Sequence, residues 1–165
     1  MGTFAQAMDA YREQLKKGAI QVAYRGLMEY MLALRNHFQV KYPHYSVPGS
    51  IYFGYMDMTY FSLLPEALKQ RKLKIAIVFL HEPGRFEAWL AAVNKQVQHE
   101  YWQMIKDSGW DRYPLVATTL GADAILEHVL VDRPDFSDLA ELTAQIENTT
   151  LDFITTVEGF LSQHR

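Results

Sequence analysis

Asp57 is the residue whose chemistry most needs an explanation. It lies in residues 50–61, where its neighbours are mostly aromatic, β-branched or methionine side chains. A carboxylate in such a segment reaches solvent, pairs with a cation, or has its pKa raised by the loss of water. If the segment is a strand, alternation places Asp57 on the same face as Tyr55 and Thr59. Two interpretations stay open: a structural partner for a buried arginine, and a carboxylate that binds a ligand or a metal ion.

Three further polar candidates lie at the two ends of residues 73–80, the most apolar stretch of the chain. Lys74 stands at its start beside other basic residues, where it either extends into solvent or helps to hold an anion. His81 and Glu82 follow its end, where ligands collect in sheets with helical crossovers. A polar loop that caps a helix is the alternative for this pair, since adjacent side chains point apart and no second histidine follows at metal-binding spacing.

Aromatic residues surround these positions. The chain has 3 Trp, 10 Tyr and 9 Phe, and Tyr and Trp are favoured in pockets and interfaces as well as in cores. We therefore predict a binding surface that joins aromatic and polar side chains, with one arginine of the second helix as a cationic partner. Its candidate residues are Tyr52, Tyr55, Asp57, His81, Trp89 and Arg25.

The sequence also excludes several classes of chemistry. It has no Cys, which excludes disulfides, thiolate metal sites and cysteine nucleophiles, and it has no P-loop, dinucleotide-binding or serine-nucleophile motif. Its 16 basic and 19 acidic residues give a net charge of −3, which disfavours nucleic acid as a partner. The longest fully apolar run, residues 75–80, is far shorter than the roughly 20 residues of a membrane helix. Without a signal-peptide pattern, we expect a soluble, cytoplasmic protein.

The elements that must position these residues follow from the apolar periodicity. Helical spacing predicts two N-terminal helices within residues 3–42 and a C-terminal helix over 137–163. Residues 50–61, 73–80 and 125–131 are typical of strands, and 115–118 is a short candidate strand. Residues 86–107 carry apolar side chains at helical spacing and predict a crossover helix.

This order of elements predicts an α+β fold, with a three-layer α/β/α arrangement as the alternative. We expect one domain over residues 1–165, with the sheet and the crossover helix within 50–131. A mixed sheet of four or five strands would pack against the long helices. Residues 73–80 should form a central strand, and residues 125–131 should pair parallel to it through a right-handed crossover.

Several segments together resemble a family of small bacterial proteins known only as a domain of unknown function. The segments are residues 20–31, 49–61, 73–81, 86–90 and 127–136, and the resemblance extends over most of residues 5–162. It implies a soluble single-domain bacterial protein, and it brings no catalytic or binding residue to this chain.

A second resemblance concerns the order of acidic and basic residues. An acidic residue on one strand and a lysine on the next are similar to the restriction-endonuclease-like core, which holds a catalytic metal ion there. Asp57 and Lys74 would take two of those places. Lys72 stands where that core has an acidic residue, so the resemblance implies an inactive relative.

Two functional hypotheses follow. The first is a module that binds a small ligand or a protein without catalysis and without a cofactor, and that self-associates. The second is a nuclease-like phosphodiesterase in which Asp57, Glu82 and Lys74 surround Mg²⁺, which would activate water and stabilise phosphate charge.

Overall fold

The computed structural model describes residues 2–164. The chain forms two compact units, one that ends at Leu34 and one that begins at Arg35. The boundary falls within helix α2 (Ala19–Lys41), and each unit is described on its own. The prediction of a single domain is not tested by this division.

The first unit contains helix α1 (Phe4–Lys16) and most of α2. The Thr3 hydroxyl accepts a hydrogen bond from the Gln6 backbone N–H, and the Gln6 side chain accepts one from the Thr3 backbone N–H. This capping box fixes the start of α1. None of the helices described has the length and apolarity needed to cross a membrane.

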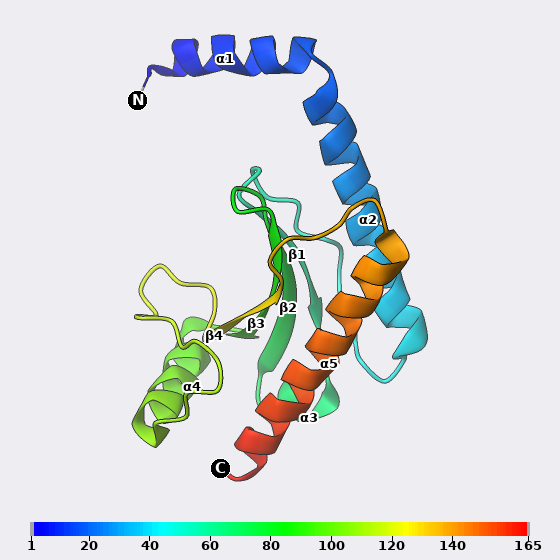
Figure 1. Ribbon diagram of the computed structural model, residues 1–165. Helices are drawn as coiled ribbons and strands as arrows, with labels where there is room; N and C mark the ends of the chain where they lie inside the picture. Colours follow the sequence, from blue (N-terminus) through cyan, green and yellow to red (C-terminus); the bar gives the residue numbers. More distant parts are fainter. Residues whose placement is uncertain (1, 165) are drawn as a thin grey trace. The chain divides into compact units, whose positions relative to one another are not determined.

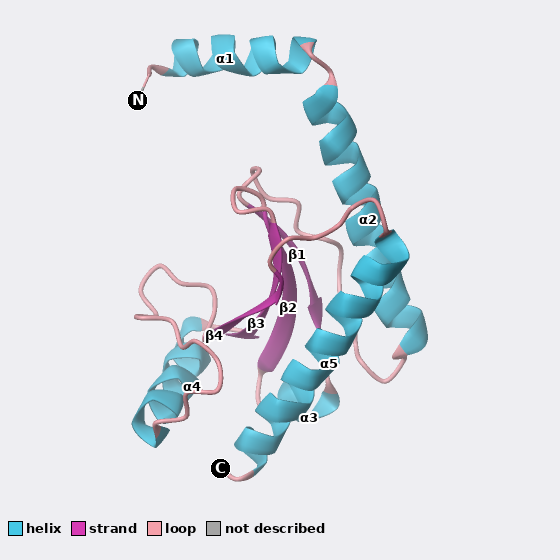
Figure 2. Cartoon of the chain, viewed as in Figure 1, coloured by secondary structure: helices cyan, strands magenta, loops and turns pink. Residues whose placement is uncertain are grey.

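The second unit is built on one four-stranded sheet (Figures 1 and 2). Its strands β1 (Met58–Leu63), β2 (Leu73–Leu80), β3 (Arg85–Ala92) and β4 (Leu126–Val131) lie in sequence order, and every neighbouring pair is antiparallel. Helix α3 (Glu66–Lys69) joins β1 to β2, and α4 (Lys95–Ser108) lies between β3 and β4. Helix α5 (Leu139–Ser162) follows β4. The expected α+β fold is confirmed, and residues 73–80 do form an interior strand.

The predicted crossover helix over 86–107 is wrong in its first half. Residues 85–92 form β3, which pairs with β2 through a hairpin turn over residues 81–84, where Gly84 has φ +69°. Six consecutive residues of β3, from Phe86 to Ala91, are buried, so both faces of the strand are covered. Burial on both faces removes the alternation that marks a strand, and the remaining apolar spacing fits a helix equally well.

The pairing of strands also differs from the expectation. Because β3 returns beside β2 as a hairpin, the next strand, β4, lies beside β3 and not beside β2, and the sheet is antiparallel where a mixed sheet was expected. Residues 115–118 contribute one isolated bridge, Leu115 with Leu126. Of the predicted strand over 50–61, only the residues from Met58 onward form a strand, as the start of β1. The residues before Met58 form a loop, which is joined to β1 by a single bridge between Tyr52 and Tyr60.

Antiparallel register assigns the side chains to two faces. The first face carries Phe61, Ile77, Ala88 and His128 in one row across the four strands. Helix α5 covers this face, with the Phe153 ring 5.4 Å from that of His128 (Figure 1). This packing encloses the main core.

The second face carries the row Ala76–Trp89–Glu127. The next pair on this face, two residues further along each strand, is Lys74 beside Ala91. Ala76 and Trp89 form a small buried cluster with Val78 and Ala124. We call this side of the sheet the second face. Its side chains are only partly covered, which leaves room for a pocket.

Candidate ligand-binding pocket

The second face contains a pocket of about 340 Å³. This volume lies at the lower end of the range of roughly 300–1,000 Å³ that is usual for small-molecule sites. Residues from three strands and from two loops line it. They are Tyr52, Met58, Tyr60, Lys74, Ala76, Trp89, Ala91, Ala92 and Asp123.

Small side chains create the space. Ala76 pairs with Trp89 across β2 and β3, and Ala91 pairs with Lys74 in the next position on the same face. Each pair therefore sets one long side chain beside one methyl group. Because the alanines stop at Cβ, the large neighbours become walls around an unfilled volume.

The indole of Trp89 is held in place by a buried ion pair. Its Nε1–H donates to Glu87 Oε1 at 2.8 Å, and the Arg85 Nε–H donates to Glu87 Oε2 at 2.6 Å. Glu87 is only 2% exposed, so these two hydrogen bonds replace the water that its carboxylate loses. The hydrogen bond to Glu87, followed by its charge, raises the pKa of Arg85. The three residues fix the orientation of the largest wall of the pocket.

A second carboxylate, Glu127, stands beside this network on β4. Burial raises the pKa of Glu127 first, and the negative charge of Glu87 raises it further, while Arg85 acts in the opposite direction. Burial, followed by the charge of Glu87, thus makes the Glu127 carboxylate easier to protonate than an exposed glutamate.

Asp123 lies at the rim of the pocket, just before β4. The buried side-chain amide of Gln98 donates hydrogen bonds to the carbonyl oxygens of Ala122 and Ala124, at 2.9 and 3.1 Å. The Lys95 ammonium also donates to Ala122 O, at 2.7 Å. These bonds hold the backbone on both sides of Asp123, so α4 sets the position of that carboxylate.

Tyr52 and Tyr60 form the remaining aromatic wall. Their backbones exchange two hydrogen bonds, of 2.9 and 3.0 Å, and their ring centroids lie 5.1 Å apart. Burial raises the pKa of the Tyr52 phenol, and the charge of Asp57 followed by those of other acidic groups, Asp123 among them, raises it further.

Lys74 and Asp123 are the two charged residues that line this pocket. Neither side chain has a hydrogen bond or an ion pair with any residue between 2 and 164, including the other. Lys74 is nevertheless half-buried within a strand. The pocket therefore offers one cation and one anion to whatever enters it.

The sequence predicts Asp57 on a strand, but this residue lies in the tight loop before β1. Its Oδ1 accepts a hydrogen bond from the Tyr55 backbone N–H at 2.9 Å. Backbone hydrogen bonds from Tyr55 and Met58 lower the pKa of Asp57. The loop also contains Met56 and Gly54 at φ +63° and +73°. This carboxylate stabilises a turn, and it has no arginine partner among residues 2–164.

His81 lies next to this loop. Its backbone N–H donates to Asp57 O at 3.0 Å, and its Nε2 lies 2.8 Å from the Thr59 hydroxyl. Because that hydroxyl donates to Phe53 O, Nε2 carries the proton and donates to Thr59. Burial lowers the pKa of His81, and the charge of Asp57 acts in the opposite direction. These contacts connect the β2–β3 turn to the loop before β1.

The proposed metal site of the nuclease-like hypothesis does not form. Lys74 lies about 20 Å, at roughly 3.3 Å per residue, from Leu80 at the other end of β2, and Glu82 lies in the turn beyond Leu80. Asp57 lies at the Glu82 end of the strand, beside His81. Residues 2–164 also contain no group of three His, Asp or Glu side chains arranged to hold a metal ion.

Of the other predicted binding residues, Tyr52 and Trp89 line the pocket and Tyr55 does not. Tyr55 is 90% exposed. Arg25 belongs to the first unit, on α2, where it is exposed. The role of each of these residues in binding stays a prediction.

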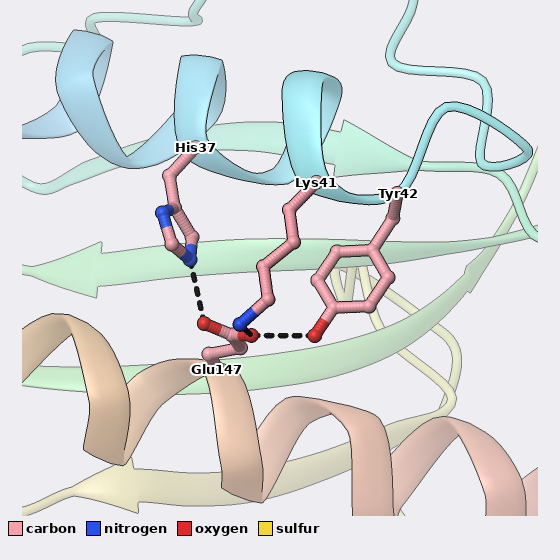
Figure 3. A network of polar contacts seen from close by, with 4 residues as sticks. All are labelled: His37, Lys41, Tyr42 and Glu147. Carbon is pink, nitrogen blue, oxygen red and sulfur yellow. Dashed lines mark hydrogen bonds and ion pairs between the residues drawn. The ribbon is translucent and has the colours of Figure 1, made fainter.

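A second polar cluster joins the end of α2 to α5 within the second unit (Figure 3). The buried carboxylate of Glu147 accepts hydrogen bonds from His37 Nε2 at 2.5 Å, Lys41 Nζ at 2.6 Å and the Tyr42 hydroxyl at 2.5 Å. Burial alone would raise its pKa, but the hydrogen bonds from Lys41, Tyr42 and His37 together lower it to about 2. Burial and Glu147 raise the pKa of Tyr42 to about 12. Both carboxylate oxygens are occupied, so this cluster acts as a structural clasp.

The fold and the pocket define a small α+β protein built on an antiparallel four-stranded sheet. The chain belongs to the family described as "Domain of unknown function (DUF7000)", whose model matches residues 4–161. This confirms the expected family. No curated protein and no solved structure matches the chain, and the resemblance to the restriction-endonuclease-like core is not supported. The bacterial origin, the cytoplasmic location and self-association stay predictions.

Proposed function

We propose that this protein is a binding module whose pocket on the second face takes a small organic molecule with a flat, apolar part. The observation that carries the proposal is that buried polar residues fix the walls of the pocket. Glu87 holds Trp89, and Gln98 holds the backbone around Asp123.

Burying polar groups such as these costs free energy, and a fold does not need them for its stability. Removing a carboxylate or an amide from water is unfavourable unless every hydrogen bond is replaced, and apolar residues of similar size often serve as well. Here the two most buried of these groups are Glu87, which is bonded to the pocket residue Trp89, and Gln98, which is bonded to the backbone on both sides of the pocket residue Asp123. A binding site benefits from this arrangement, because pre-organised walls lose little entropy when the ligand enters.

The shape of the pocket indicates the kind of molecule. Three aromatic side chains, Tyr52, Tyr60 and Trp89, line one volume with alanines between them. Aromatic walls favour flat rings through stacked or edge-to-face contacts. A neutral flat heterocycle such as indole is therefore the simplest probe.

The proposal is tested by titrating the ¹⁵N-labelled protein with indole and following its amide and indole N–H signals. We expect saturable shifts at Trp89 Nε1–H and at residues 74–76 and 89–92. At roughly −0.3 kcal/mol or better per heavy atom, the Kd should be roughly 10 mM or lower. Ala91→Leu extends a side chain into the pocket and should weaken binding at least about tenfold.

Ala140→Leu is the matched control, because Ala140 is exposed in the first turn of α5 and does not line the pocket. This variant should bind indole like the unmodified protein. Shifts that do not saturate, or equal binding by the Ala91→Leu variant, would reject the pocket as the site.

A further inference from the structure

The two charges of the pocket are complementary to a molecule that carries both signs. Lys74 stands on β2 beside Ala91, and Asp123 stands on the segment that precedes β4. Both line the same volume, yet their charged groups lie more than the 4 Å of an ion pair apart. The space between them is open to a ligand that would join them.

We propose that the ligand is an amphoteric molecule of the α-amino-acid class with a flat apolar side group, whose carboxylate contacts Lys74 and whose ammonium group contacts Asp123. This inference rests on the proposed function, since it names the class of molecule for the same pocket.

Lys74 supports the carboxylate half of this inference. A lysine near the end of a strand normally extends its ammonium group to solvent or pairs it. Here the side chain is half-buried among apolar pocket residues and has no partner between residues 2 and 164. A ligand carboxylate would supply the missing acceptor, and such charge-assisted bonds are stronger than neutral ones.

Asp123 and the aromatic rings support the ammonium half. Tyr52 and Asp123 line the same pocket, and the charge of Asp123 adds to the rise in the pKa of Tyr52 that burial and the charge of Asp57 cause first. A pocket that is lined by one carboxylate and by the rings of Tyr52 and Tyr60 provides the two features that attract an ammonium group, an opposite charge and a π system. Gln98 fixes the backbone that carries Asp123, so the carboxylate does not depend on a mobile loop.

Ligands of one sign fit less well. A phosphate ester or a dicarboxylate would bring two negative charges to a single lysine, with Asp123 nearby to repel them. A cation without a carboxylate would meet Lys74 unfavourably and leave it unpaired. A neutral molecule would cover both charges without pairing either of them, which costs free energy through lost hydration.

Three probes that share one phenyl ring separate these contributions. L-phenylalanine carries both charges, 3-phenylpropionate carries only the carboxylate, and 2-phenylethylamine carries only the ammonium group. Their Kd values are measured at pH 7 and low salt by the same amide titration. We expect phenylalanine to bind at least about tenfold more tightly than either of the other two.

Two isosteric variants test the assignment of each charge. Lys74→Met should weaken phenylalanine about tenfold and leave 2-phenylethylamine unchanged or tighter. Asp123→Asn should weaken phenylalanine and 2-phenylethylamine, and leave 3-phenylpropionate unchanged or tighter. Lys69→Met and Asp111→Asn remove the same charges from exposed positions outside the pocket and should change none of the three.

The outcomes distinguish this inference from the proposed function. If indole binds and Ala91→Leu prevents it, but phenylalanine binds no more tightly than the singly charged probes, the ligand class is wrong and the pocket stands. Equal loss in the Lys74→Met variant and its Lys69→Met control would also overturn the assignment. If neither indole nor phenylalanine shifts any pocket signal, both proposals fail.

Discussion

At the scale of single residues, Gly54 shows how tightly the loop before β1 is built. Its φ is +73°, and a Cβ placed there would lie 2.0 Å from the backbone oxygen of Met58 and 2.8 Å from Asp57 Oδ1. The first of these contacts is with backbone, which cannot move aside without opening the turn. The loop carries Tyr52, so the shape of this turn also sets one wall of the pocket.

We predict that Gly54→Ala lowers the free energy of unfolding by about 2–4 kcal/mol, which combines left-handed strain with a steric clash. Gly49→Ala is the control, because Gly49 has a similar φ of +67° but open space around its Cβ position. It should cost only about 1 kcal/mol. Urea unfolding followed by circular dichroism measures both values, and equal losses in the two variants would show that the Met58 contact is unimportant.

Glu87 is the other residue with a sharply defined role. Its negative charge is the second cause that raises the pKa of Glu127, after burial. Glu87→Gln keeps an acceptor for Trp89 Nε1–H but removes the charge. We predict that the pKa of Glu127 falls in this variant, because repulsion disappears while the attraction of Arg85 remains. Carboxyl ¹³C shifts measured against pH would detect the change, and a pKa that stays the same or rises would contradict it.

At the scale of elements, the clasp around Glu147 links the end of α2 with α5. The pKa of Glu147 is depressed from 4.5 to about 2. A depressed carboxyl pKa stabilises the folded state fully above the unfolded value, and the stabilisation is lost as the pH falls towards the folded value. The clasp should therefore weaken between about pH 4.5 and about pH 2.

We predict that the free energy of unfolding falls by about 3 kcal/mol through this group as the pH decreases across that window. The Glu147→Gln variant should be less stable at pH 7 and should depend less on pH in this range. Glu82→Gln, at the exposed β2–β3 turn, serves as the control and should keep the full dependence. Urea unfolding at a series of pH values tests this, and parallel curves for Glu147→Gln and the unmodified chain would exclude the clasp as the cause.

The elements differ in how far the sequence predicts them. Helices within 3–42 and 137–163 follow from the helical spacing of their apolar residues, and the strand at 73–80 follows from its nearly continuous run of apolar residues. Strand β3 does not follow from the sequence, because its apolar residues also satisfy helical spacing. The wrong element for residues 86–92 then led to the wrong neighbour for β4 and to a parallel pairing.

The residues of the pocket, too, can be predicted only in part from the sequence. Tyr52, Lys74 and Trp89 attract attention by residue type, and all three line it. Tyr60 and Asp123 were missed because they join the pocket only through the order of the strands, which local patterns do not specify. Alternation within β2 and β3 was the available signal, since Lys74–Ala76 and Trp89–Ala91 each place a long side chain and an alanine on one face. Glu147 lies 110 residues from His37, and no local pattern connects them.

At the scale of the whole molecule, the sheet of the second unit joins strands with very different loop lengths. β2 and β3 are connected by a four-residue turn, whereas residues 93–125 separate β3 from β4. A short turn closes at a small entropic cost, and a long connection closes at a larger one. Hence β4 is the strand whose pairing depends most on distant parts of the chain, with Gln98 on α4 bonded to the carbonyl groups just before it.

This connection has a consequence for how the molecule would respond to what it captures. Asp123 lines the pocket only when β4 is paired with β3. A ligand that contacts both Lys74 and Asp123 would therefore hold β4 against the rest of the sheet. Separation of β4 from β3 and release of the ligand would then be one event, because the strand with the longest connection also carries the segment that completes the pocket.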